Sequence, residues 1–225
     1  MPKNTYRIAH PLTGTLGRGF DRFADSFMRS FGKRVDLRSG ACIAGAVAMR
    51  DCLEAIGVPA RVIGVTCVVL REGHQPAFIG EPDDRKPRDN TRFAGHVVTL
   101  AGESLLIDPS LAQAHRDRFP EMPHLMAGWC AAAPRLAPGM TAEDWRVRLL
   151  EASNKHGVEI RYYYRDDTPD WSQTPDANSA RWAGIVTSIR DRYAGQPFAA
   201  ELARACAEVQ LPEPARERPA TGETP

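Results

Sequence analysis

The spacing of apolar residues predicts two helices near the start of the chain. The segment "LGRGFDRFADSFMRSF" (16–31) places phenylalanines at three- and four-residue steps, which is the period of one helix face. A second helix is expected over 40–56, with Ser39 as its N-cap and Gly57 and Pro59 beyond its end. Its first turns, "ACIAGAVAM", are small and apolar on every side, so we expect its amino end to be buried in the core.

Alternating and β-branched segments predict a sheet after these helices. The run "ARVIGVTCVVL" (60–70) is nearly continuous, which is typical of a strand covered on both faces. The segments "FAGHVVTL" (93–100) and "SLLIDPS" (104–110) predict a β-hairpin around residues 101–103. The polar stretch 71–92 is expected to be a long surface loop.

The carboxyl-terminal part predicts further elements and a tail. Helices are expected over 141–151, 176–193 and 197–209, and a strand is expected over 157–164. Residues 211–225 are too polar and proline-rich to bury a face, so we predict a disordered tail. The length fits a single domain over residues 1–210.

Composition narrows the function classes. Of the 225 residues, 43% are hydrophobic and 25% charged, which is average for a globular protein. Lys and Arg total 29 against 28 acidic residues, and no long basic stripe is present, which argues against nucleic acid as a main partner. No apolar run is long enough to span a bilayer and none follows the first residues as in a leader peptide, so a soluble, cytoplasmic protein is expected, with no membrane partner. Its five cysteines lack CxxC spacing and are expected to be reduced thiols.

The hairpin decides whether two residues with catalytic potential can meet. Residues that face each other across antiparallel strands have position numbers with a constant sum. A three-residue loop at 101–103 makes that sum 204, so His96 faces Asp108 directly and both side chains leave the same face. A two-residue loop at Gly102–Glu103 would send the two side chains to opposite faces. The parity of the loop therefore decides whether His96 and Asp108 can pair.

These two residues and one cysteine suggest covalent catalysis. A carboxylate bonded to one imidazole nitrogen fixes the ring and leaves the other nitrogen to take a proton, which makes His96 a base and Asp108 its orienter. The first turn of a helix favours a thiolate, and Cys42 alone among the cysteines has that predicted placement. Together the three residues form a nucleophile, base and orienter set.

Each of the three residues also has a structural interpretation. A cysteine in a small apolar helix is usually a packing residue, and a strand histidine is often a satisfied structural group. Asp108 before Pro109 is typical of a turn or a cap. The conjunction of the three residues, rather than any one of them, favours catalysis.

Two kinds of metal site have suitable residue types but unsuitable spacing. The loop acids Asp83, Asp84 and Asp89 lack an EF-hand register and stand among basic residues, so a solvated loop is expected there. The three candidate residues, joined by His115 or His124, include every zinc-ligand type, yet no close-spaced ligand pair supports zinc. No metal or cofactor is therefore predicted.

The order of these features is similar to that of a known superfamily. A helix beginning G-x-C, the phrase "LEAIGVPARVIGV", a strand with "GHVV" and a strand ending "LIDPS" resemble the transglutaminase-like superfamily, within the papain-like fold, over residues 36–112. The resemblance implies an α+β fold with a central antiparallel sheet packed against the cysteine helix. It also implies a catalytic triad of Cys42, His96 and Asp108. Many members have an aromatic residue shortly after the histidine, where this chain has two valines.

The resemblance implies thiol-dependent acyl chemistry on an amide bond. Cys42 would form a thioester, which water resolves in a peptidase or amidase and an amine resolves in a transferase. A protein or peptide substrate is expected, and a small-molecule amide and the oligomeric state stay open. The run "RSGAC" (38–42) also resembles the R-G-G-x-C of arylamine N-acetyltransferases, which share the triad order. A non-catalytic binding or partner module on the same fold is the alternative from a different class. Loss of Asp108 is expected to be milder than loss of Cys42 if water can hold the imidazole instead.

Overall fold

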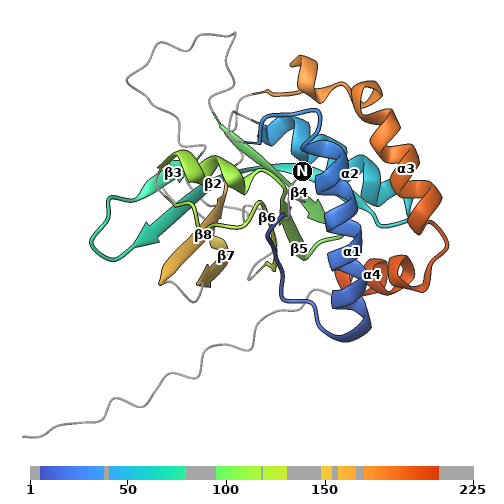
Figure 1. Ribbon diagram of the computed structural model, residues 1–225, viewed down its shortest axis with the longest axis horizontal. Helices are drawn as coiled ribbons and strands as arrows, with labels where there is room; N and C mark the ends of the chain where they lie inside the picture. The colour runs from blue at the N-terminus through green and yellow to red at the C-terminus, as the bar shows by residue number, and fades with distance from the viewer. Residues whose placement is uncertain are drawn as a thin grey trace, which may run out of the picture.

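The computed structural model describes residues 6–37, 41–79, 95–117, 119–130, 148–153, 157–165 and 170–207. Within these residues the protein is α+β, as the sequence predicts. Its helices lie together on one side of a sheet (Figure 1). They are α1 (Gly14–Phe31), α2 (Cys42–Ala55), α3 (Ala183–Tyr193) and α4 (Pro197–Ala207).

The described strands form one mixed sheet. They are β1 (Ile8–Ala9), β2 (Ala60–Arg71), β3 (Ala77–Ile79), β4 (His96–Ala101), β5 (Leu105–Asp108), β6 (Leu125–Trp129), β7 (Arg148–Ser153) and β8 (Val158–Tyr164). Their order is β1-β6-β5-β4-β2-β8-β7, and β3 pairs with β2 outside this path. The β1–β6 pair is parallel, and the other described pairs are antiparallel. The long β2 strand pairs with β4 through its first half and with β3 and β8 through its second half.

Apolar residues fill both faces of the sheet. One cluster joins the phenylalanines of α1 and the first turns of α2 to α3 and α4. A second cluster joins residues of β2 and β8 to the short 3-10 helix η1 (Leu111–Asp117). Side chains alternate along β4, so that Val97 packs into the first cluster and Val98 into the second. By the same alternation His96 belongs with Val98, on the face away from α2.

The start of α2 differs from the prediction. The helix begins at Cys42 rather than at residue 40, and its N-cap is Ala41, which makes no side-chain capping bond. Ser39, the predicted N-cap, lies outside the described residues. Cys42 is therefore the first residue of the helix and not its third.

Two predicted segments need a further correction. The stretch 71–92 contains the short strand β3, because Ala77–Ile79 pair with the second half of β2. The predicted helix 141–151 is wrong over 148–151, which belong to strand β7. The rest of that helix, the loop acids at 83, 84 and 89, and the tail 211–225 lie outside the described residues.

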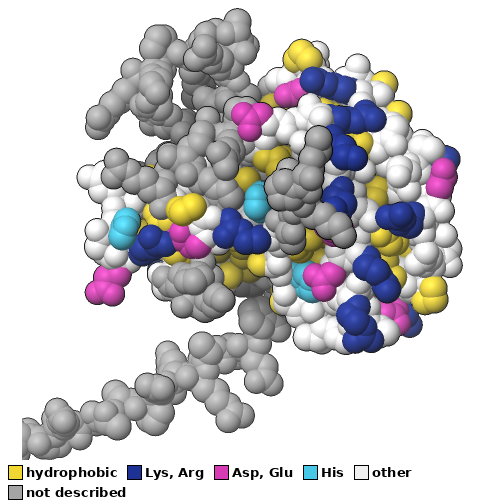
Figure 2. Space-filling view, in the orientation of Figure 1, with side chains coloured by type: hydrophobic (Ala, Val, Ile, Leu, Met, Phe, Trp, Pro, Cys, Tyr) yellow, Lys and Arg dark blue, Asp and Glu magenta, His cyan; other side chains and the backbone are white. Residues whose placement is uncertain are grey.

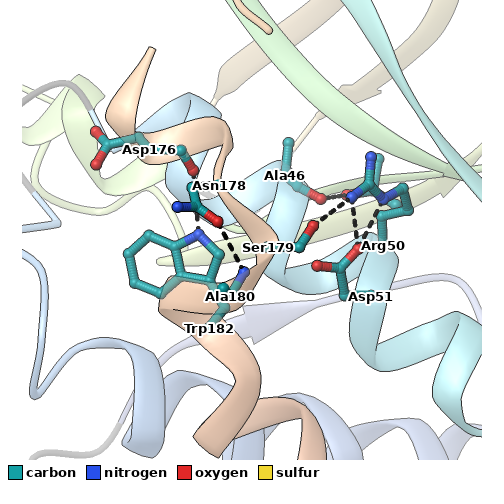
Figure 3. A network of polar contacts seen from close by, with 9 residues as sticks. Ala46, Arg50, Asp51, Asp176, Asn178, Ser179, Ala180 and Trp182 are labelled. Carbon is teal, nitrogen blue, oxygen red and sulfur yellow. Dashed lines mark hydrogen bonds and ion pairs between the residues drawn. The ribbon is translucent and has the colours of Figure 1, made fainter. Parts of the chain in front are cut away.

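One polar contact ties α2 to the segment 175–182 that precedes α3, and another lies within that segment (Figure 3). Arg50 Nη2 donates to Ser179 Oγ at 3.0 Å. Trp182, which is 1% exposed, donates from its indole Nε1 to the carbonyl of Asp176 at 3.1 Å. The carboxyl-terminal part, for which the sequence suggests no role, thus braces the helix that carries the cysteine. None of the helices in the described part of the chain has the length and apolarity needed to cross a bilayer.

Candidate active site

The hairpin of β4 and β5 brings His96 and Asp108 together. Its loop is Gly102–Ser104, one residue later than predicted, and paired positions such as Thr99 and Ile107 have a sum of 206 rather than 204. The loop still has three residues, so the parity that places His96 and Asp108 on one face is kept. Asp108 therefore lies diagonally across from His96 and not directly opposite.

The position of the loop follows from Gly102. This residue has a φ of +56°, in the left-handed region that favours glycine. A Cβ there would lie 2.3 Å from the carbonyl oxygen of Cys206 in α4. Both features require glycine at the first loop position, which explains the shift from 101 to 102.

His96 and Asp108 form a fully buried pair. His96 Nε2 and Asp108 Oδ2 are 2.9 Å apart, and neither residue is exposed at all. An ionised carboxylate can only accept hydrogen bonds, so Nε2 carries the proton and Nδ1 is the acceptor of the neutral ring. Within the described part of the chain, Nδ1 is buried and has no partner at full hydrogen-bond geometry.

Asp108 receives donors on both carboxylate oxygens. Oδ1 accepts from the backbone N–H and the hydroxyl of Ser110, at 2.9 and 2.8 Å. Oδ2 accepts from the Tyr162 hydroxyl at 2.9 Å as well as from His96. Burial acts to raise the pKa of Asp108, but the charge and hydrogen bond of His96 and the two bonds from Ser110 outweigh burial and lower the pKa below 3.8. The buried carboxyl group is therefore held as an anion.

Cys42 lies near enough to the imidazole to affect its pKa. Burial acts to lower the pKa of His96, but the charge and hydrogen bond of Asp108, followed by the hydrogen bond and charge of Cys42, raise it from 6.5 to about 10. Because Asp108 occupies Nε2, Nδ1 is the ring nitrogen left for the thiol. The ring is thus placed to take and hold the proton of Cys42.

The first turn of α2 provides donors around Cys42. The first bond within the helix runs from Gly45 N to Ala41 O at 2.8 Å. The backbone N–H groups of Cys42, Ile43 and Ala44 consequently have no acceptor inside the helix. These groups and the helix dipole create positive potential beside Cys42.

The other four cysteines lie in different surroundings. All five are free thiols, as the sequence predicts, and all are buried. Burial raises the pKa of Cys52 and Cys67, and it raises that of Cys130 and Cys206 to about 12. These four thiols therefore stay protonated near neutral pH.

A close contact explains how a helix on one face reaches residues on the other. Pro109, which follows Asp108 beyond the end of β5, packs against α2 at Gly45. A Cβ at Gly45 would lie only 3.0 Å from Pro109 Cγ. The amino end of α2 thus overhangs the ends of β4 and β5, where His96 and Asp108 stand. Cys42 meets His96 at this edge, although the body of α2 covers the opposite face.

Sequence reasoning missed Tyr162 and Ser110, which both bond to Asp108. Ser110 lies two residues beyond Asp108, and an aspartate that accepts from the N–H two positions later is a common turn. The signal for Tyr162 was only its place in a strand, where alternation puts it on one face with Val158 and Ile160. Nothing in the sequence relates that strand to the aspartate.

The zinc alternative lacks its fourth ligand in the described residues. His124 packs edge-on against Tyr6 and accepts the backbone N–H of Arg7 at Nδ1, beside β1. The side chain of His115 lies outside the described residues. No group of three or more His, Cys, Asp or Glu side chains is arranged to hold a metal within the described ranges.

A polar hollow of about 320 Å³ lies between α1 and α3. It is lined by Asp25, Ser26, Arg29, Ser30, Ser188, Ile189 and Arg192. Lys and Arg side chains gather over the helical side of the surface (Figure 2). Both cations of the hollow have partners, since Arg29 pairs with Asp25 at 2.7 Å and Arg192 donates to Ser26 at 3.0 Å. The hollow contains no nucleophile with a base, so the site at Cys42 is the stronger candidate.

Comparison with protein-family models, curated proteins and solved structures finds no match for this chain. The candidate function therefore depends on the geometry of the site.

Proposed function

We propose that this protein is a thiol-dependent enzyme with a papain-like, transglutaminase-type arrangement, which acts on an amide bond through Cys42, His96 and Asp108. The observation that carries the proposal is the buried hydrogen bond between Asp108 and His96, with Cys42 at the start of α2 close enough to the imidazole to raise its pKa. Covalent acyl chemistry requires a nucleophile, a base and an orienter in this order. The mainly antiparallel sheet beside the cysteine helix also supports the proposed arrangement.

The proposed reaction starts with transfer of the Cys42 proton to His96 Nδ1. The thiolate attacks the amide carbonyl carbon, an S–C bond forms, and the carbonyl electron pair moves to oxygen. The C–N bond then breaks, and His96 returns its proton to the departing amine, which leaves a thioester. Water attacks the thioester carbon and gives a proton to His96. The C–S bond then breaks, and His96 returns the proton to the Cys42 sulfur, which releases a carboxylic acid and restores the thiol. An amine acceptor in place of water gives a new amide by the same steps.

The oxyanion of each tetrahedral intermediate needs donors that are already in place. The backbone N–H of Cys42 is the first candidate, because it has no acceptor within α2. The positive end of the helix dipole acts on the same oxygen. The start of α2 would thus stabilise both the thiolate and the oxyanion.

Selective alkylation of Cys42 tests the proposal. The native protein is treated with iodoacetamide near neutral pH, and the labelled cysteine is identified by peptide mass spectrometry. We expect Cys42 to react first, because burial keeps the other four thiols protonated. His96→Ala should slow the reaction of Cys42 by about a hundredfold, the lower range for loss of an acid–base partner.

Controls separate catalysis from a binding module. Cys206→Ser should leave the labelling rate of Cys42 unchanged, and Cys42→Ser should remove the fast phase while circular dichroism stays that of the native fold. Equal labelling of all cysteines, or a rate of Cys42 that does not depend on His96, would favour a non-catalytic binding module on the same fold.

A further inference from the structure

We propose that Tyr162 is a positioning residue of the site, which keeps Asp108 ionised and its Oδ2 atom directed at His96. The catalytic consequence of this inference rests on the proposed function, whereas the contact itself does not. Tyr162 belongs to β8, more than fifty positions beyond Asp108 in the chain.

The contact is specific and fully buried. The Tyr162 hydroxyl donates to Asp108 Oδ2 at 2.9 Å, the same atom that accepts from His96 Nε2 at 2.9 Å. None of the three residues has any exposed surface, so no water replaces a lost donor without rearrangement. One carboxylate oxygen is thus fixed between a phenol and an imidazole.

The sheet must curl to make this contact. Two strands, β4 and β2, separate β5 from β8. In a flat sheet three strand spacings amount to about 14 Å, which exceeds the reach of a tyrosine side chain. The bond from Tyr162 to Asp108 therefore spans the concave side of a curved sheet. The contact therefore depends on the curvature of the whole sheet, because β5 and β8 are not neighbouring strands.

The proton of the Tyr162 hydroxyl can be assigned. Tyr162 has one hydroxyl proton, and the carboxylate of Asp108 can only accept, so that proton points at Oδ2. Cys67 pairs with Tyr162 across β2 and β8, and its side chain lies close enough to the phenol to affect the pKa of that group. Burial and the charge of Asp108 raise the pKa of Tyr162 well above 10, which keeps the phenol a donor. Among the described residues, Cys67, His96 and Tyr162 interact electrostatically with Asp108, and Cys42 interacts with His96.

Loss of the Tyr162 hydroxyl removes one of four donors from a buried anion. The protonated form of Asp108 then becomes easier to reach, because hydrogen bonds to the charged form favour that form. Once Asp108 is protonated, His96 loses its charged partner and becomes a weaker base for Cys42. The hydrogen bond from Tyr162 should therefore determine the pH below which the reactivity of Cys42 falls.

Tyr162→Phe tests this role, because it removes only the oxygen atom. In the full chain, the ¹³Cγ resonance of Asp108 is followed as the pH is lowered. We expect the midpoint of its titration to rise by about one pH unit or more, since a hydrogen bond to a charged group contributes that much. The acid limb of the rate of Cys42 alkylation should move in the same direction. Tyr164→Phe, two positions along the same strand, is the matched control and should change neither.

The two readouts separate this inference from the proposed function. If Cys42 of the native protein is not selectively alkylated, the proposed function fails and the resonance of Asp108 alone decides the role of Tyr162. If Cys42 reacts as expected but Tyr162→Phe leaves both titrations unchanged, the inference is wrong and the function stands. If Tyr162→Phe does not fold, the hydroxyl proton of Tyr162 is observed by NMR in the native protein instead. A slowly exchanging hydroxyl resonance that disappears in Asp108→Asn supports the contact. If the native protein shows no such resonance, the inference is wrong.

Discussion

Asp108 keeps its negative charge at a position that solvent does not reach. It is 0% exposed and accepts hydrogen bonds from His96, Tyr162 and Ser110. The expectation of a mild effect required water to reach the site and hold the imidazole, but Asp108 is fully buried. Removal of Asp108 should therefore be severe.

Asp108→Asn should cost at least about a hundredfold in the alkylation rate of Cys42 at pH 7. Ser110 donates to Oδ1, so the asparagine oxygen takes that place and its amide group turns to His96. Nε2 must then accept, the ring proton moves to Nδ1, and Nδ1 can no longer take a proton from Cys42. Nitrogen-15 shifts of the ring report the tautomer. A rate within about threefold of the native protein would contradict this account.

The position of α2, the helix that carries Cys42, depends on Gly45. Gly45→Ala places a Cβ 3.0 Å from Pro109 Cγ, so α2 has to move away from the end of β5. The gain in helix propensity, about 1 kcal/mol, offsets the cost of that shift in the free energy of unfolding. We expect near-native stability in urea but slower alkylation of Cys42, because its distance from His96 changes.

A second glycine in a helix provides the control for this effect. Gly184→Ala in α3 brings a Cβ to 3.1 Å from the guanidinium of Arg34, a flexible end that can move aside. It should raise stability in urea and leave the alkylation rate of Cys42 unchanged. Equal alkylation rates in Gly45→Ala and Gly184→Ala would show that the contact at Pro109 does not position Cys42.

The elements also show which predictions from sequence succeed. The pairing of His96 with Asp108 survives the one-residue shift of the loop, because the alternation of side chains depends on parity alone. In strand β7 the adjacent residues Leu149 and Leu150 do not fit the strict alternation that marks a strand in the sequence. Pairing with β8 overrides local preference there, and a register shift between Arg148 and Leu150 lets both leucines be buried.

At the scale of the whole molecule, the curl of the sheet cannot be predicted from any short segment of the sequence. Cys42, His96 and Asp108 could be named as candidates from the sequence because each has chemistry of its own and a place in a predicted element. Tyr162 could not, since its contact with Asp108 depends on the curvature of four neighbouring strands. Curvature arises from the twist and packing of the entire sheet on its two apolar clusters.

The buried ion pair should make the stability of the entire protein depend on pH at both ends. The lowered pKa of Asp108 means that its contribution is present above about pH 4 and is lost as the pH falls through the folded value. The pKa of His96, raised from 6.5 to about 10, means that its contribution is complete below pH 6.5 and is lost as the pH rises towards 10. The pair should thus stabilise the fold most between about pH 4 and 6.5.

Urea unfolding between pH 6.5 and 10 measures the alkaline side of this dependence. In the native protein, release of the His96 proton should lower the free energy of unfolding by up to about 1.4 kcal/mol for each pH unit. His96→Gln should lose this slope below about pH 8, because the glutamine has no proton to release there, whereas at higher pH the four buried thiols lower the stability of both proteins. His74→Gln changes an exposed imidazole and should keep the native slope. If the slopes of the native protein and His96→Gln agree over this range, His96 does not hold its proton more tightly in the folded state, and the charged pair with Asp108 has to be abandoned.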